Sequence, residues 1–292
     1  MTAPLTVNSA SPLLEFLFAS LPEVKRTKVR QWLKYGAIQV NGVAVTQGNH
    51  ALHIGDCVTV LSKGQTQPAS RLPAGMTIVF EDATLIVIDK PENLLSIASE
   101  TERDKTAHAY LSDYVKKGNK HSKERVWIVH RLDRETSGLM VFAKTEAAKQ
   151  ALQNNWNTAK KQYLAVVEGG PIAEHGTIES HLDESGPYKV FSTTASERTR
   201  LAITHYRVLK RTKTNALIEL DLETGRRNQI RVHLADERCP IIGDPKYGAV
   251  TNPARRLGLH ASQLQIVHPT TNDRLTFSSP LPDVLARLFQ NS

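Results

Sequence analysis

The chain of 292 residues has only two cysteines, Cys57 and Cys239, far apart and without paired spacing. Neither a zinc site nor a disulfide framework is therefore indicated. Uninterrupted apolar runs fall short of the ~20 residues that span a bilayer. The first residues, MTAPLTVNSASPLLEFLF, lack the basic and apolar segments of a secretion signal. We expect a cytoplasmic protein that does not enter a membrane.

Several motifs of common enzymes are also missing. There is no glycine-rich phosphate loop followed by lysine and serine or threonine, and no GxSxG elbow. His130, His233 and His260 have spacings that match no familiar metal-ligand pattern. We therefore expect neither a nucleotide cofactor nor a metal ion.

Positive charge is what the sequence has in excess. Lysine and arginine number 37 against 29 acidic residues, which gives a formal net charge of +8. Such an excess favours a polyanionic partner, with nucleic acid as the leading candidate. The densest basic run, KKGNKHSKER at 116–125, is either a solvated loop or a phosphate contact.

The first 62 residues predict a small domain of two helices and a few strands. Ser11 and Pro12 are placed to start one helix, and Thr27 to cap a second, basic and amphipathic one. A hairpin turning at Asn41-Gly42 and a strand ending at Leu61 follow. Residues 63–75 are rich in glycine, proline, serine and glutamine, which predicts a linker.

Residues 76–292 predict a second, larger domain in which strands dominate. Helices are sparser than strands, and regular alternation of the two is absent. This pattern indicates an α+β fold with a mixed, mainly antiparallel sheet. The strand candidates are 77–80, 85–88, 126–130, 139–143, 162–167, 201–209, 215–222 and 260–267, and the helix candidates are 106–117, 146–157, 228–237 and 281–289.

Three segments of the larger domain contain candidate chemical groups. Asp133 lies between Arg131 and Arg134 in a polar turn, where neighbouring arginines favour the ionised carboxylate. Taken alone, such an aspartate is more often a capping or salt-bridge residue. Tyr163 lies in an apolar strand, where a packed ring is the more common role. Arg231 follows Arg226 and Arg227 closely and suits a carboxylate or phosphate partner.

Together, HRLDRETSGLMVFAK, KQYLAVVEG and TGRRNQIRVHLA resemble the RluA family of pseudouridine synthases. The resemblance extends from about residue 76 to the end, through EDATLIVIDKPENLLS, IIGDPKYG and LGLHASQLQIVHP, while residues 5–62 look like an S4-like RNA-binding domain. It implies catalytic roles for Asp133, Tyr163 and Arg231. It also implies substrate contacts by Arg131, Arg226 and the apolar Ile230.

The sequence departs from the family pattern at two places. Arg227-Asn228 replaces the usual Thr-His, and Asn93 stands near a usual glycine. Neither change removes a catalytic group that the resemblance implies. The extra charge of Arg227 is expected to alter RNA contacts or local packing.

The resemblance implies an isomerase that needs no cofactor and converts uridine to pseudouridine in large-subunit (23S) ribosomal RNA, with transfer RNA as the alternative substrate. The oligomeric state is open from the sequence, and we expect a monomer. Two other functions compete with this one. A non-catalytic RNA-binding protein would explain the basic N-terminal domain. A metal-dependent RNA hydrolase would need a carboxylate cluster that the sequence does not offer.

Overall fold

The computed structural model describes residues 4–34, 37–41, 43–45, 47–61, 72–116, 119, 121–170, 173–186 and 188–290. The chain divides into two compact units, Met1–Leu72 with Tyr110–Glu124, and Pro73–Ala109 with Arg125–Ser292. Most of the predicted linker lies outside the described ranges, as do Gly42 and part of the 116–125 basic run. The boundaries at residues 62 and 76 therefore stay a prediction. No helix within the described ranges is long and apolar enough to cross a membrane.

The smaller unit combines short helices with two small sheets. One antiparallel sheet has the order β1-β6-β3-β4, and β2 pairs with β5. Leu17, Val29 and Ile38 belong to the buried core of this smaller unit. The elements are β1 (Leu5–Thr6), β2 (Ser11–Pro12), α1 (Leu13–Ser20), α2 (Arg26–Lys34), β3 (Ile38–Val40), β4 (Val43–Ala44), β5 (Ala51–Leu52) and β6 (Cys57–Val60).

Both predicted helix caps in this unit are wrong. Ser11 is paired with Leu52 in β2 and β5, and Pro12 takes the N-cap position of α1 without a side-chain hydrogen bond. Helix α2 already includes Arg26 and Thr27, so Thr27 lies inside the helix. In α1, pairing with a strand distant in sequence has overridden the local capping preference.

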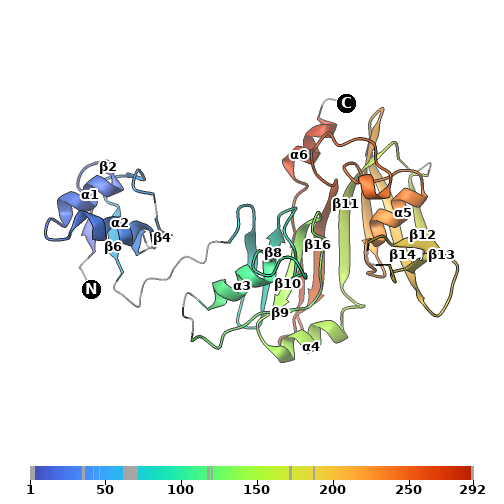
Figure 1. Cartoon of the computed structure of the whole chain (residues 1–292), viewed down its shortest axis with the longest axis horizontal. Coiled ribbons are helices and arrows are strands. Elements are labelled where there is room, and N and C mark those ends of the chain that lie inside the picture. Colours follow the sequence, from blue (N-terminus) through green and yellow to red (C-terminus); the bar gives the residue numbers. More distant parts are fainter. Residues whose placement is uncertain are drawn as a thin grey trace. The chain divides into compact units, whose positions relative to one another are not determined.

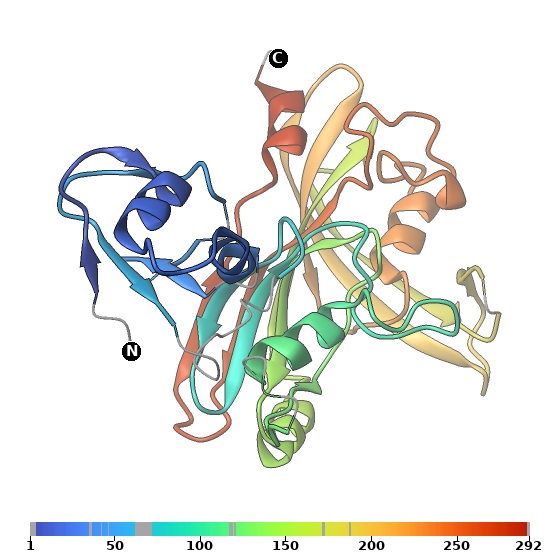
Figure 2. The same ribbon diagram turned by 60° about the vertical axis from the view of Figure 1, so that its left-hand side comes forward.

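The larger unit is built on an eleven-stranded sheet, shown in two orientations in Figures 1 and 2. The main strand order is β13-β12-β14-β15-β11-β16-β10-β8-β7, with β17 paired to β16 and β9 to β10. Among the described strand pairs, β10 with β16 is parallel and the others are antiparallel. The expected mainly antiparallel α+β fold is confirmed. The elements are β7 (Thr77–Glu81), β8 (Leu85–Lys90), α3 (Ala107–Val115, whose range crosses the division between the units), β9 (Trp127–Ile128), β10 (Ser137–Ala143), α4 (Glu146–Asn154), β11 (Lys160–Glu168), β12 (His175–Asp183), β13 (Phe191–Thr193), β14 (Thr199–Arg211), β15 (Asn215–Leu222), α5 (Gln229–Asp236), η1 (Pro245–Tyr247), β16 (Leu259–Val267), β17 (Arg274–Ser278), α6 (Asp283–Ala286) and η2 (Arg287–Phe289).

Two helices cover different parts of this sheet (Figure 1). Thr145 caps the N-terminus of helix α4, because its hydroxyl accepts a hydrogen bond from the amide of Ala148. Leu152 of this helix packs in the core that contains β8 and β10. Helix α5 places Ile230 and Leu234 in the core formed by β11 and β15. This apolar contact holds α5 against the part of the sheet that contains β11 and β15.

Candidate active site

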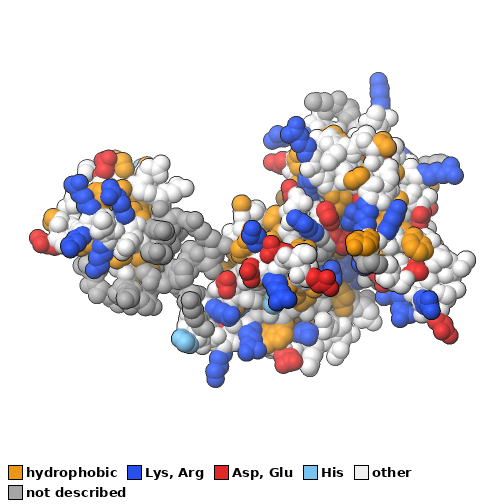
Figure 3. Space-filling model, viewed as in Figure 1, with side chains coloured by type: hydrophobic (Ala, Val, Ile, Leu, Met, Phe, Trp, Pro, Cys, Tyr) orange, Lys and Arg blue, Asp and Glu red, His pale blue; other side chains and the backbone are white. Residues whose placement is uncertain are grey.

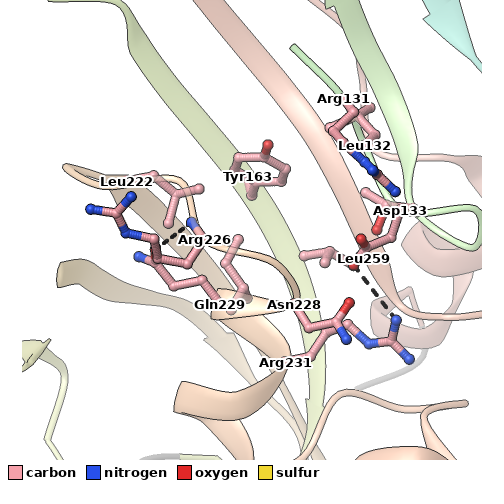
Figure 4. Close-up of a pocket in the computed structure, with 12 residues that line it drawn as sticks. Arg131, Leu132, Asp133, Tyr163, Leu222, Arg226, Asn228, Gln229, Arg231 and Leu259 are labelled. Atoms are coloured by element: carbon pink, nitrogen blue, oxygen red, sulfur yellow. Dashed lines mark hydrogen bonds and ion pairs between the residues drawn. The ribbon is translucent and has the colours of Figure 1, made fainter. Parts of the chain in front are cut away.

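All six site residues predicted from the sequence line one cavity in the larger unit (Figure 4). The cavity has a volume of about 390 Å³, which includes space open to solvent. Its walls come from the turn before β10, from β11, β15 and β16, and from the start of α5. The lining residues are Arg131, Leu132, Asp133, Thr136, Tyr163, Leu222, Arg226, Asn228, Gln229, Ile230, Arg231 and Leu259.

Backbone contacts on both sides hold the turn that carries Asp133. The Ser96 hydroxyl donates a hydrogen bond to the Leu132 carbonyl at 2.7 Å and accepts one from the Leu132 amide at 3.1 Å. On the other side, the Thr136 amide donates to the Asp133 carbonyl at 3.2 Å. Ser96 and Thr136 are both buried. The carboxylate of Asp133 is therefore presented to the cavity from a fixed backbone.

Lys90 connects this turn to the lysine-proline segment after β8. Its side chain is fully buried, and its ammonium donates hydrogen bonds to the carbonyls of Leu94 at 2.8 Å, Pro91 at 3.0 Å and Arg134 at 3.3 Å. Burial lowers the pKa of Lys90 to about 8, although the charge of Asp133 opposes this shift. Lys90 was not among the site residues predicted from the sequence, and its position directly before Pro91 was the available signal.

Arg231 of α5 is the cation that faces Asp133. Its Nη1 atom lies 3.6 Å from an oxygen of Asp133 and 3.6 Å from an oxygen of Glu135. Its other two nitrogens donate to Asp244, from Nε at 2.7 Å and from Nη2 at 2.8 Å. The expected pairing with Asp133 is present in the structure, but the bidentate partner is Asp244, which sequence analysis missed. Asp244 lies in the quoted segment IIGDPKYG, directly before a proline.

Burial and charge act in opposite directions on these ionisable groups. Burial and the charge of Glu135 raise the pKa of the Asp133 carboxyl above its ordinary value, although the charges of Arg231 and Arg131 oppose this shift. Burial lowers the pKa of Arg231, but its hydrogen bonds and charge interaction with Asp244 leave that pKa above its ordinary value. The two groups therefore form an ion pair in a partly desolvated cavity, where charge interactions are stronger than in water.

Tyr163 lies in β11, between Leu222 and the Asp133 turn (Figure 4). The pairing of β11 with β16 shifts register between Gln162 and Tyr163, and such a bulge re-aims the side chain that follows it. Burial, followed by the charge of Asp133, raises the pKa of the Tyr163 hydroxyl above its ordinary value. The phenol therefore stays protonated and presents both a flat ring and a proton donor to the cavity.

The remaining predicted residues form the other walls. Ile230 is buried at 4% exposure and supplies an apolar surface, whereas Arg131 is exposed at the rim. The loop before α5 is held by buried Gln229, whose side-chain oxygen accepts hydrogen bonds from the Arg226 amide at 3.0 Å and the Thr224 hydroxyl at 2.8 Å. Gln229 is a positioning residue that sequence analysis did not single out.

The two sequence departures have local structural explanations. Asn93 and Asn228 have φ angles of 62° and 54°, in the left-handed region that asparagine tolerates better than most residues other than glycine. Arg227 turns away from the cavity: its backbone amide donates to the Glu184 side chain, and its guanidinium donates to the carbonyls of Glu184 and Gly186. The extra charge of Arg227 thus serves local packing.

Comparison with known proteins assigns this fold and cavity to a family. The family model described as RNA pseudouridylate synthase matches residues 84–236, a range that includes Asp133, Tyr163 and Arg231. The chain belongs to this family. The expected isomerase, which converts uridine to pseudouridine in RNA, is therefore confirmed, and a non-catalytic RNA-binding protein and an RNA hydrolase are disfavoured.

Relatives of this pseudouridine synthase match it over most of its length. RNA pseudouridine synthase YlyB of Bacillus subtilis is 33% identical over 95% of this chain and 92% of its own. Ribosomal large subunit pseudouridine synthase D of Vibrio cholerae is 34% identical over 91% of this chain and 86% of its own. The solved structure of human RNA pseudouridylate synthase domain containing 4 superposes with a TM-score of 0.60 at 27% identity, covering 72% of this chain and 90% of that one.

Proposed function

We propose that this enzyme isomerises uridines in large-subunit (23S) ribosomal RNA, with Asp133 as the catalytic carboxylate. The observation that carries the proposal is the convergence of Asp133, Tyr163 and Arg231 on one cavity. The substrate class is supported by the similar proteins of Vibrio cholerae and Xanthomonas campestris, both named ribosomal large subunit pseudouridine synthase D. The N-terminal RNA-binding domain inferred from the sequence fits the same substrate.

In the proposed reaction, the bond between the ribose and the uracil nitrogen breaks, the base rotates, and the ribose is rejoined through carbon 5. The nitrogen gains a proton and carbon 5 loses one, so no oxidant or reductant is consumed. Asp133 acts either as a nucleophile on the ribose or as the base that starts a glycal route. Both roles require an ionised carboxylate, which Arg231 stabilises.

The other lining residues have roles that follow from their contacts. Tyr163 stacks on the uracil and assists proton transfer with its protonated hydroxyl. Ile230 supplies an apolar surface for the base, and Arg131 and Arg226 contact the RNA at the rim. Because a uridine must leave its stack to enter the cavity, at a cost of a few kcal/mol, backbone contacts elsewhere have to offset that cost.

We assign residues 1–62 as the S4-like domain that supplies part of those contacts, and residues 76–292 as the catalytic domain. Helix α2 exposes Arg26, Lys28 and Arg30. The guanidiniums of Arg26 and Arg30 lie 5.1 Å and 5.6 Å from the centre of the Phe18 ring, an arrangement that suits phosphate and base contacts. We further propose that the enzyme is a cytoplasmic monomer. It needs no nucleotide cofactor, because isomerisation has no net energy requirement.

The test measures release of tritium from carbon 5 of uridine in unmodified 23S ribosomal RNA and in transfer RNA. Asp133→Asn should abolish release while preserving the fold and most RNA affinity. Glu135→Gln is a matched control, since Glu135 also lies 3.6 Å from Nη1 of Arg231 but does not line the cavity. Release by Asp133→Asn would overturn the residue assignment, and release from transfer RNA alone would overturn the substrate class.

A further inference from the structure

Three cationic side chains surround one buried aromatic ring next to the cavity. The Tyr247 ring centre lies 5.2 Å from the Arg231 guanidinium carbon, 5.3 Å from the Lys189 ammonium and 5.7 Å from the Lys246 ammonium. Tyr247 is only 6% exposed. A cation within about 6 Å of a ring centre is attracted by its π electrons, so the ring helps to hold like charges together.

The hydroxyl of Tyr247 fixes the ring in place. It accepts hydrogen bonds from the Asn228 side-chain amide at 2.9 Å and from the Val190 backbone amide at 3.1 Å. Asn228 lines the cavity, and Val190 follows Lys189 in the chain. The ring therefore joins the cavity wall to the segment that carries Lys189.

The cations differ in how their charge is balanced. Arg231 has three acidic partners, Asp244, Asp133 and Glu135. Lys189 and Lys246 are exposed, and neither forms an ion pair with any residue in the described part of the chain. Two accessible ammonium groups at the same ring, neither of them in a described salt bridge with a carboxylate, form a site suited to an external anion.

The position of Lys246 relative to the catalytic groups supports an anion site beside the cavity. Partial burial and the charge of Arg231 lower the pKa of Lys246, and the charge of Asp133 partly offsets the shift. In the structure, Lys246 and Arg231 both lie within 5.7 Å of the Tyr247 ring centre, and Arg231 faces Asp133. Figure 3 shows basic and acidic side chains interspersed on the visible face of the larger unit.

The segment carrying Lys189 is anchored by Arg227, one of the two departures from the family pattern. The Arg227 guanidinium donates to the Glu184 and Gly186 carbonyls, and the same segment is tied to Tyr247 through Val190. Arg227 therefore helps to hold the segment that carries Lys189.

We propose that Lys189 and Lys246 form a phosphate-binding subsite for the RNA strand next to the target uridine. The inference deepens the proposed function, since it takes RNA as the ligand. A strand that delivers a uridine to the cavity carries phosphates on both sides of that nucleotide. Contact with these phosphates holds the strand while the base is turned out.

The test compares the salt dependence of binding of an unmodified 23S ribosomal RNA transcript to the full-length enzyme and its variants. The double variant Lys189→Ala with Lys246→Ala should bind roughly tenfold more weakly, and the plot of log affinity against log salt should be shallower by about 1.5, since each phosphate contact contributes about 0.7 to 0.9. The KM for tritium release should rise more than kcat falls. Lys189→Arg with Lys246→Arg should restore the slope.

Lys213→Ala is the matched control. Lys213 is an exposed lysine of the same unit, beyond the end of β15 opposite to the cavity-lining Leu222. An unchanged slope in the double alanine variant, or an equal change in Lys213→Ala, would overturn the subsite. The slope can be measured even if the enzyme releases no tritium from this RNA, so failure of the subsite and failure of the proposed substrate are distinguishable.

Discussion

Arg231 donates two hydrogen bonds to Asp244, at 2.7 Å and 2.8 Å, while its third nitrogen lies 3.6 Å from Asp133. The tighter contact is thus made to a carboxylate behind the cavity, and the looser one to the carboxylate inside it. Asp244 is 1% exposed, so it fixes the guanidinium before any substrate arrives. Asp133 keeps an oppositely charged neighbour without being locked in a bidentate pair.

Asp244→Asn should therefore impair both stability and turnover. Removing one partner of a buried ion pair costs about 3 to 5 kcal/mol, and the remaining contacts of Arg231 to Asp133 and Glu135 place the expected loss at the lower end of that range. Urea unfolding and tritium release measure the two effects. Glu135→Gln, which removes a half-exposed partner of the same arginine, should change stability by less than about 1 kcal/mol. Wild-type turnover in Asp244→Asn would contradict a positioning role.

Gly138 allows β10 to run beside β16 directly after the Asp133 turn. Its φ angle is 114°, and an added Cβ atom would lie 2.3 Å from the carbonyl oxygen of Ala261. Gly138→Ala should destabilise the fold by more than about 3 kcal/mol, because backbone atoms have no room to move. Gly225→Ala, where nothing lies within 4 Å of the added atom, is the control. Equal unfolding midpoints for the two variants would refute this explanation.

The strand pattern of the larger unit was predictable where alternation or continuous burial was strong. All seven residues of β10 are buried, and β15 places Ala216, Ile218 and Leu220 in the core. Strands β12, β13 and β17 were missed. In β12 only Ile178 and Leu182 are buried, so its sequence HGTIESHLD has little periodicity, and pairing with distant strands determines its conformation.

The site was predictable in its residue types but not in its contacts. Asp133, Tyr163 and Arg231 were selected through motif resemblance, because spacing alone does not bring a turn, a strand and a helix to one cavity. Asp244 lies 13 residues from Arg231, across α5 and a loop, and no local pattern pairs the two. The loop contacts of Arg227 likewise depend on tertiary structure, which brings residues 184–186 to the start of α5.

Substitutions at Asn93 test whether its left-handed backbone conformation explains one departure from the family pattern. Its φ angle is 62°, and its side chain is exposed. Asn93→Ala should lower the free energy of unfolding by about 1 kcal/mol, because a Cβ atom without a local polar contact is disfavoured in the left-handed region. Asn93→Gly should lie within about 0.5 kcal/mol of wild type. A higher free energy of unfolding in urea for Asn93→Ala than for Asn93→Gly would contradict this explanation.

His233 should make stability depend on pH. It is fully buried in α5, with its ring nitrogens 2.9 Å from the Thr204 hydroxyl and 3.0 Å from the Ser180 hydroxyl. Burial lowers the pKa of His233 from 6.5 to about 4. As pH falls from about 6.5 to about 4, the unfolded chain binds a proton at this histidine that the folded chain does not, so stability must fall in this window, by about 3 kcal/mol at most. Above that window the group adds no pH dependence.

His233→Gln removes this titration and keeps a polar side chain. Urea unfolding at a series of pH values should give a shallower loss of stability between about pH 6.5 and pH 4 than in the wild-type enzyme. His175→Gln, at an exposed position of β12, controls for the loss of a histidine as such. Because the carboxylates are common to all three proteins, their contribution cancels in the comparison. Coincident slopes for the wild type and His233→Gln would mean that His233 binds its proton equally well in the folded and unfolded chains.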